Sequence, residues 1–96
     1  MNSEMAPLRA QVDLVDGQIV GLLARRFELT GRIGAIKARV GEAPRDPQRQ
    51  IDRAQMLVSL ARQHDVDEAL LIAIYQLISS EVVERHRRTA AEWAAR

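Results

Sequence analysis

The chain has 96 residues, a size that fits one domain and excludes two, because domains typically span about 50 to 250 residues. Apolar residues make up 47% of it and aromatic residues 3%, so the core must come from Leu, Ile, Val and Ala, and disorder is not expected. The net charge of +1 lacks the basic excess that is typical of nucleic-acid-binding domains. The chain has no cysteine, which excludes disulfides, thiolate nucleophiles and thiolate metal sites.

Targeting and cofactor signals are also missing from the sequence. Residues 1–7 carry neither a basic leader nor an apolar run, and no stretch reaches the roughly 18 apolar residues of a membrane span. Two histidines, His64 and His86, are too few to favour a metal site. We therefore expect a cytoplasmic protein with no cofactor, no metal, no membrane contact and no nucleic-acid partner.

A long helix is predicted for the first part of the chain. Apolar residues recur in alternating steps of four and three between Leu8 and Val40, which is the spacing of one helix face. Gly41 and Pro44 then supply a stop signal. The predicted helix over residues 8–40 would measure about 50 Å, and its internal glycines mean that packing rather than propensity must stabilise it.

Two shorter helices follow in the pattern. Asp46 before Pro47 is a strong helix start and predicts a helix that ends near Gln63. Asp65 with Glu68 resembles a capping box and predicts a third helix that ends near Trp93. Without strand alternation or repeats, the expectation is an all-α fold of three helices in a single domain over residues 1–96.

The length of the first helix predicts a dimer. About 50 Å exceeds the roughly 25 Å diameter expected for a compact domain of this size, so two shorter helices cannot cover its apolar face. We expect an intertwined homodimeric helix bundle, in which the long helices of two copies lie along each other.

Arg26 interrupts the apolar series of the first helix, between Leu22 and Leu29. A guanidinium buried there requires an anionic partner, which is either a ligand or an acidic side chain of another helix. Lys37 lies eleven residues further on, within about 20° of Arg26 around the axis and ~16 Å along it. The two cations could therefore bind one small anion lying along the helix.

Two further arginines are candidates for anion binding. Arg9 lies about 25 Å from Arg26 along the axis, so it can share a ligand with Arg26 only across an antiparallel dimer; otherwise it is a solvated surface residue. Arg49 and Gln50 lie in the first turn of the second helix, whose N–H groups favour an anion. The alternative is that Asp46 caps this helix and Arg49 is simply exposed.

The third helix brings Ser79, Val82, Val83 and His86 onto one face, where a histidine can equally be half-buried without a role. The basic run over residues 85–88 is typical of a solvated helix end and is weak support for nucleic-acid binding.

In this order the segments resemble the small all-α chorismate mutases, whose three-helix chains form entangled homodimers. The resemblance rests on five blocks that follow one another over most of the chain: residues 8–9, 22–29, 33–37, 45–49 and 75–78. It implies that Arg26, Arg49 and Arg9 from the partner chain bind the two substrate carboxylates. It also implies that Lys37 binds a carboxylate and the ether oxygen, and that the Asp46 backbone meets the ring hydroxyl.

Three positions depart from the family pattern. Gln50 stands where the family normally has a glutamate, and it can still bond a hydroxyl without carrying charge. Val82 stands at a position late in the third helix where the family often has a serine. His86 stands where the family has a glutamine or glutamate that forms a hydrogen bond with the ether oxygen. The arginine and lysine frame is kept, so a dicarboxylate substrate is expected.

The implied reaction is the rearrangement of chorismate to prephenate, which needs no nucleophile, metal or cofactor. Cations would clamp the two carboxylates so that the flexible enolpyruvyl arm is held over the ring. Lys37 and His86 would donate to the ether oxygen as it gains negative charge. Because His86 donates best as an imidazolium, activity should fall as the pH rises through the range in which histidine titrates.

Other functions stay open at this point. A 4-amino-4-deoxychorismate mutase or an isochorismate pyruvate lyase could use the same frame, and a non-catalytic helical dimerisation module would use Arg26 only structurally. The resemblance also implies that a larger partner enzyme can activate the chain. The C-terminal segment over residues 87–96, which carries the only tryptophan at Trp93, is the best candidate for that contact.

Overall fold

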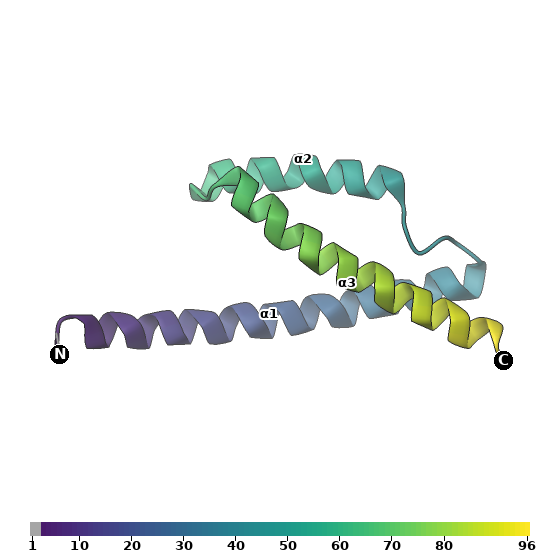
Figure 1. The fold of residues 1–96 in the computed structure, drawn as a ribbon, viewed down its shortest axis with the longest axis horizontal. Coiled ribbons are helices and arrows are strands. Elements are labelled where there is room, and N and C mark those ends of the chain that lie inside the picture. Colours follow the sequence, from purple (N-terminus) through teal and green to yellow (C-terminus); the bar gives the residue numbers. More distant parts are fainter. Residues whose placement is uncertain (1–2) are drawn as a thin grey trace. The chain divides into compact units, whose positions relative to one another are not determined.

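The computed structural model describes residues 3–96, which form three α-helices and no strand. In Figure 1, α1 spans Met5–Val40, α2 spans Pro47–His64 and α3 spans Glu68–Ala94. The predicted all-α fold is confirmed, with α1 beginning at Met5 rather than Leu8. The chain divides into two compact units, one up to Thr30 and one over residues 31–96.

The first unit is the N-terminal part of α1, and most of its large apolar side chains are exposed. A single helix has no second element against which to bury an apolar stripe. The exposed large apolar residues of this part are Met5, Leu8, Val12, Leu14, Val15, Ile19, Val20, Leu22 and Leu29.

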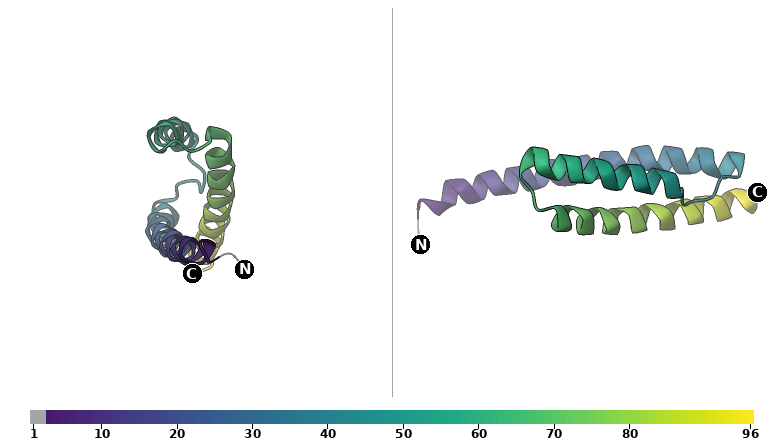
Figure 2. Two further views of the ribbon diagram at one scale, coloured as in Figure 1. Left: turned by 90° about the vertical axis from the view of Figure 1, so that its left-hand side faces the viewer. Right: turned by 90° about the horizontal axis from the view of Figure 1, so that it is seen from above.

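The second unit contains the core of the chain. Helices α2 and α3 run in opposite directions (Figures 1 and 2). The buried residues of this unit include Gly34 of α1, Leu57 and Ala61 of α2, and Val83 and His86 of α3. Leu57 and Ala61 are one helical turn apart, so they lie on the same face of α2. Leu57 also lines the pocket that lies between α2 and α3.

The connection between α1 and α2 follows its predicted capping signals. Gly41 has a φ of 76°, a conformation that glycine adopts without strain. The carboxylate of Asp46 then accepts hydrogen bonds from the backbone N–H groups of Gln48 at 3.1 Å and Arg49 at 3.3 Å. These bonds satisfy donors that have no partner within the helix, and the predicted start of α2 is confirmed.

The connection between α2 and α3 differs from the expected capping box. Asp65 ends α2 in the left-handed conformation, with φ 53° and ψ 48°. It is Asp67 that caps α3, because its carboxylate accepts the N–H of Leu70 at 2.8 Å. The side chain of Glu68 instead accepts from Arg62 at 2.9 Å. The prediction that Asp65 caps the third helix is therefore wrong, since the chain needs this residue to close the second helix.

Candidate active site

An open pocket of about 440 Å³ lies between α2 and α3 within the second unit. Its volume is in the range of small-molecule sites. Of the residues predicted to bind substrate, it contains Gln50. The lining residues are Arg45, Gln50, Arg53, Ala54, Leu57, Ile72, Tyr75, Gln76, Ser79 and Ser80.

Gln50 is fixed by the start of α2. Its backbone N–H donates to the Asp46 carbonyl at 3.2 Å, which places it in the first turn after the cap. Its side-chain oxygen accepts from the Arg45 guanidinium at 3.3 Å. With the amide oxygen engaged in this way, the amide NH₂ is the part of Gln50 that can donate to a ligand.

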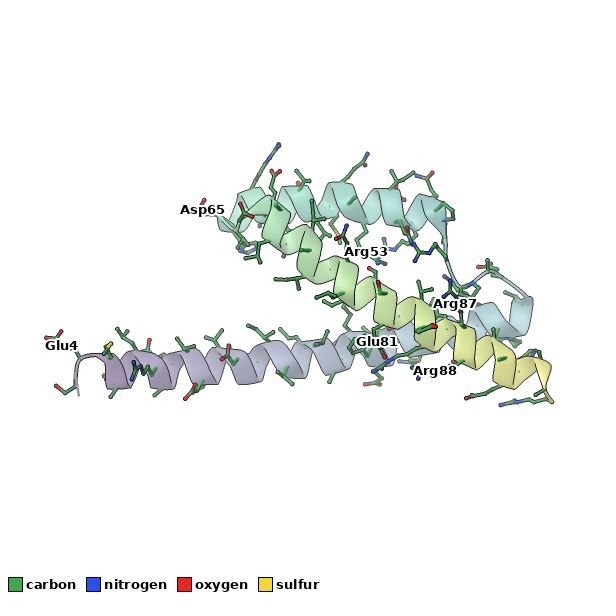
Figure 3. The ribbon with its side chains drawn as sticks, viewed as in Figure 1. Glu4, Arg53, Asp65, Glu81, Arg87 and Arg88 are labelled. Carbon is green, nitrogen blue, oxygen red and sulfur yellow. The ribbon has the colours of Figure 1, made fainter. Side chains whose placement is uncertain are left out.

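Arg53 is a pocket residue that the sequence reasoning missed. It is half-buried, lies between α2 and α3 (Figure 3), and donates from Nη1 to the Ser79 hydroxyl oxygen at 3.1 Å. The spacing contained a signal for it, because Arg53 precedes the buried Leu57 by one turn and so lies on the inward face of α2. A cation among the inward-facing apolar positions of α2 is unusual, just as Arg26 is unusual in the apolar series of the first helix.

Lys37 is half-buried near the end of α1. Its ammonium donates to the Pro44 carbonyl at 3.2 Å, and this bond ties the helix to the loop that precedes Asp46. A lysine ammonium has three donors and a carbonyl carries no net charge. The contact therefore fixes the side chain while leaving its charge uncompensated by Pro44.

His86 is buried rather than half-buried, with 5% of its surface exposed. It lies against Gly34 of α1: a Cβ atom at position 34 would be 2.5 Å from Cδ2 and 2.9 Å from Nε2 of the imidazole. Only glycine leaves room for the ring in this position. Val82 is half-buried one turn earlier on α3.

The remaining predicted residues occupy more open positions. Asp46 and Arg49 are exposed at the start of α2. In the first unit, Arg26 is half-buried, and Arg9 is exposed with Nη2 3.9 Å from the sulfur of Met5.

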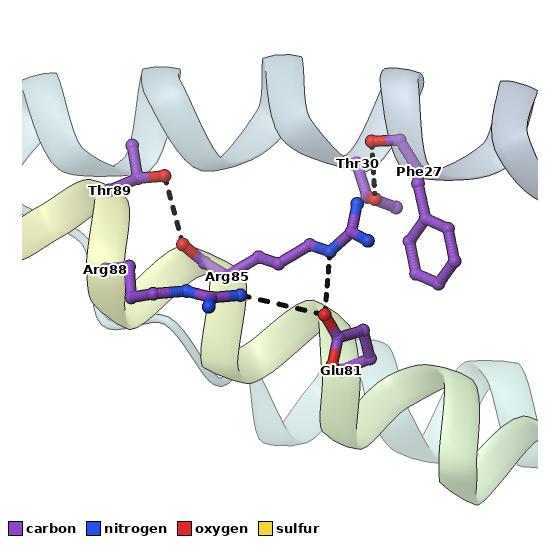
Figure 4. A network of polar contacts seen from close by, with 6 residues as sticks. All are labelled: Phe27, Thr30, Glu81, Arg85, Arg88 and Thr89. Atoms are coloured by element: carbon purple, nitrogen blue, oxygen red, sulfur yellow. Dashed lines mark hydrogen bonds and ion pairs between the residues drawn. The ribbon is translucent and has the colours of Figure 1, made fainter.

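The basic run on α3 is largely neutralised on its own helix. Figure 4 shows Glu81 in contact with both Arg85 and Arg88, at 2.9 Å and 3.7 Å, and Arg87 pairs with Glu84 at 3.8 Å. These are exposed pairs with small stabilising effects. Separately, none of the described helices combines the length and the apolar character needed to cross a bilayer.

Comparison with known proteins agrees with the resemblance read from the sequence. A family model described as chorismate mutase type II matches residues 8–87. The chain is 31% identical over 78 residues to a chorismate mutase of Methanocaldococcus jannaschii, covering 81% of this chain and 79% of that protein. It is also 31% identical over 80 residues to a 4-amino-4-deoxychorismate mutase of Streptomyces venezuelae, covering 83% and 78%.

A third relative is a fusion protein. Over 85 residues the chain is 31% identical to a bifunctional chorismate mutase/prephenate dehydratase of Escherichia coli, covering 86% of this chain and 22% of that protein. The match therefore involves one part of a longer polypeptide. Together with the three helices and the retained cationic residues, these similarities show that the chain belongs to the chorismate mutase type II family.

Proposed function

We propose that this protein is a chorismate mutase, which converts chorismate to prephenate. The observation that carries the proposal is the family match over residues 8–87, and the position of Lys37 supports it. A half-buried ammonium fixed to the Pro44 carbonyl is a preorganised donor of the kind that stabilises negative charge developing in a transition state.

The reaction moves electrons within a single substrate molecule. The ether C–O bond breaks while a new C–C bond forms at the ring, so no group enters or leaves and no proton is transferred in that step. The protein contributes by selecting the reactive conformation and by stabilising charge on the ether oxygen. In this proposal Lys37 and His86 donate to that oxygen.

The other predicted residues bind and orient the substrate. Arg26, Arg49 and Arg9 of a second copy bind the two carboxylates, as the resemblance implies. The Asp46 backbone and Gln50 meet the ring hydroxyl, while Val82 contacts the substrate from α3. Arg49 is exposed at the start of α2, where its guanidinium is accessible to a substrate carboxylate.

We also propose that the active form is a homodimer. Exposed apolar side chains follow α1 on the same face, including Val12, Val15, Ile19 and Leu22. A contiguous apolar surface of this extent is typical of a protein interface, and a second copy offers an identical surface. Activation by a larger partner enzyme, through residues 87–96 and Trp93, stays a prediction.

Product identification tests the function directly. The purified protein is incubated with chorismate, the loss of ultraviolet absorbance is followed, and the products are identified by mass spectrometry. Prephenate is the expected product. The Streptomyces venezuelae relative makes 4-amino-4-deoxychorismate the second substrate to test, and absence of turnover with both would overturn the proposal.

Arg26→Ala distinguishes an enzyme from a non-catalytic helical module. If Arg26 binds a substrate carboxylate, the variant should lose most of its activity while its helicity and oligomeric state stay close to those of the wild type. If Arg26 has only a structural role, the variant should lose helicity or its oligomeric state at least as strongly as it loses activity.

A further inference from the structure

The pocket between α2 and α3 offers hydrogen-bond donors and cations but no carboxylate. Arg45 and Arg53 contribute guanidinium groups, and Gln50 contributes an amide whose oxygen already accepts from Arg45. Among the lining residues in the described part of the chain, none is Asp or Glu. A ligand group that enters here therefore meets donors with positive charge.

Two of the relatives, which are matched over 79% and 78% of their own length, are named for substrates that differ at one ring position. Chorismate has a hydroxyl where 4-amino-4-deoxychorismate has an amino group. A hydroxyl oxygen has lone pairs and can accept from a guanidinium. An alkylamine is mostly protonated near neutral pH; its ammonium form has no lone pair and is repelled by a nearby cation.

Of the two arginines in the pocket, Arg53 is the one whose position allows it to discriminate between a hydroxyl and an ammonium group on the substrate. Arg45 is exposed, so water screens its charge and its side chain can move away from a ligand. Arg53 is half-buried, and the 3.1 Å bond from its Nη1 to the Ser79 oxygen fixes it across the pocket. Its charge is less screened and its position is determined by two helices.

We propose that Arg53, oriented by Ser79, is a specificity-determining residue that selects the hydroxyl-bearing substrate over the amine-bearing one. This inference rests on the proposed function, in which Gln50 meets the ring hydroxyl. Arg53 lies three residues after Gln50 on the same helix, about 60° around its axis. The two side chains line the same pocket, so a group bound by Gln50 lies within the electrostatic influence of Arg53.

The test compares kcat/KM for chorismate and for 4-amino-4-deoxychorismate in the wild type and in Arg53→Met. The wild type should prefer chorismate, and the variant should reduce that preference by a factor of about ten or more, which corresponds to ~1.4 kcal/mol. Arg53→Lys keeps a cation and should retain most of the preference. Arg62→Met is the matched control, because Arg62 lies on the same helix but is exposed and pairs with Glu68. The substrate preference of this control variant should equal that of the wild type.

The outcomes separate this inference from the proposed function. If the wild type converts neither substrate, the proposed function fails and the inference fails with it. If the wild type converts chorismate but Arg53→Met keeps the wild-type preference, or if the wild type prefers the amine, only the inference is overturned. Should Arg53→Met lose its helicity, Ser79→Ala decides: a reduced preference supports the role of Arg53, and an unchanged one overturns it.

Discussion

At the scale of single residues, the contact between Gly34 and His86 joins α1 to α3. The imidazole occupies the space that a side chain at position 34 would need. Its ring is nearly rigid and buried, so it cannot move aside without disturbing α3. Gly34 is therefore needed to leave room for the imidazole, whereas Gly31 on the same helix faces open space.

We predict that Gly34→Ala lowers activity about tenfold or more, because displacing a catalytic donor by a fraction of an ångström weakens its hydrogen bond to the reacting oxygen. Gly31→Ala is the control: a Cβ there meets nothing within 4 Å, and alanine should raise the free energy of unfolding by up to ~1 kcal/mol. Steady-state kinetics and urea denaturation measure both. Equal activity in the two variants would contradict a fixed role for His86.

At the scale of elements, the short connection between α2 and α3 shows how two neighbouring aspartates take different tasks. Asp65 adopts the left-handed conformation that ends α2, and Asp67 accepts the Leu70 N–H at the start of α3. Left-handed backbone is unfavourable for residues other than glycine, although aspartate tolerates it better than most. Capping, in contrast, depends on the carboxylate itself.

These two aspartates should therefore respond in opposite ways to substitution. We predict that Asp65→Gly raises the free energy of unfolding by about 0.5 kcal/mol, since it removes backbone strain at a positive φ. Asp67→Ala should lower it by about 1 kcal/mol through loss of the cap. Urea denaturation at one fixed protein concentration measures both, because assembly makes stability concentration-dependent; destabilisation by Asp65→Gly would contradict this assignment.

At the scale of the whole molecule, the buried core of one chain is small relative to its exposed apolar surface. Within residues 3–96 the buried apolar side chains are Leu57, Ala61 and Val83, whereas Ile19 and Leu22 of α1 are 56% and 66% exposed. Burial of apolar surface is the main favourable contribution to folding. The homodimer that we propose would supply the burial that a single chain lacks.

We predict that Ile19→Glu weakens self-association strongly, since it places a charge in the proposed apolar interface. Gln18→Glu adds the same charge at the adjacent exposed position and should have a much smaller effect. Sedimentation velocity over a range of protein concentrations measures the association of each. If Ile19→Glu assembles as the wild type does, the interface does not include this face of α1.

The sequence alone determined the fold class, the three helices and the start of α2, because apolar spacing and capping chemistry are local properties. The choice of Asp67 rather than Asp65 as the cap of α3 needed the structure, since the two aspartates compete for the cap and only the path of the backbone decides between them. The burial of His86 against Gly34 and the bond from Arg53 to Ser79 were also decided by tertiary structure. Arg53 and Ser79 are 26 residues apart, and no local pattern reports which side chains two packed helices bring together.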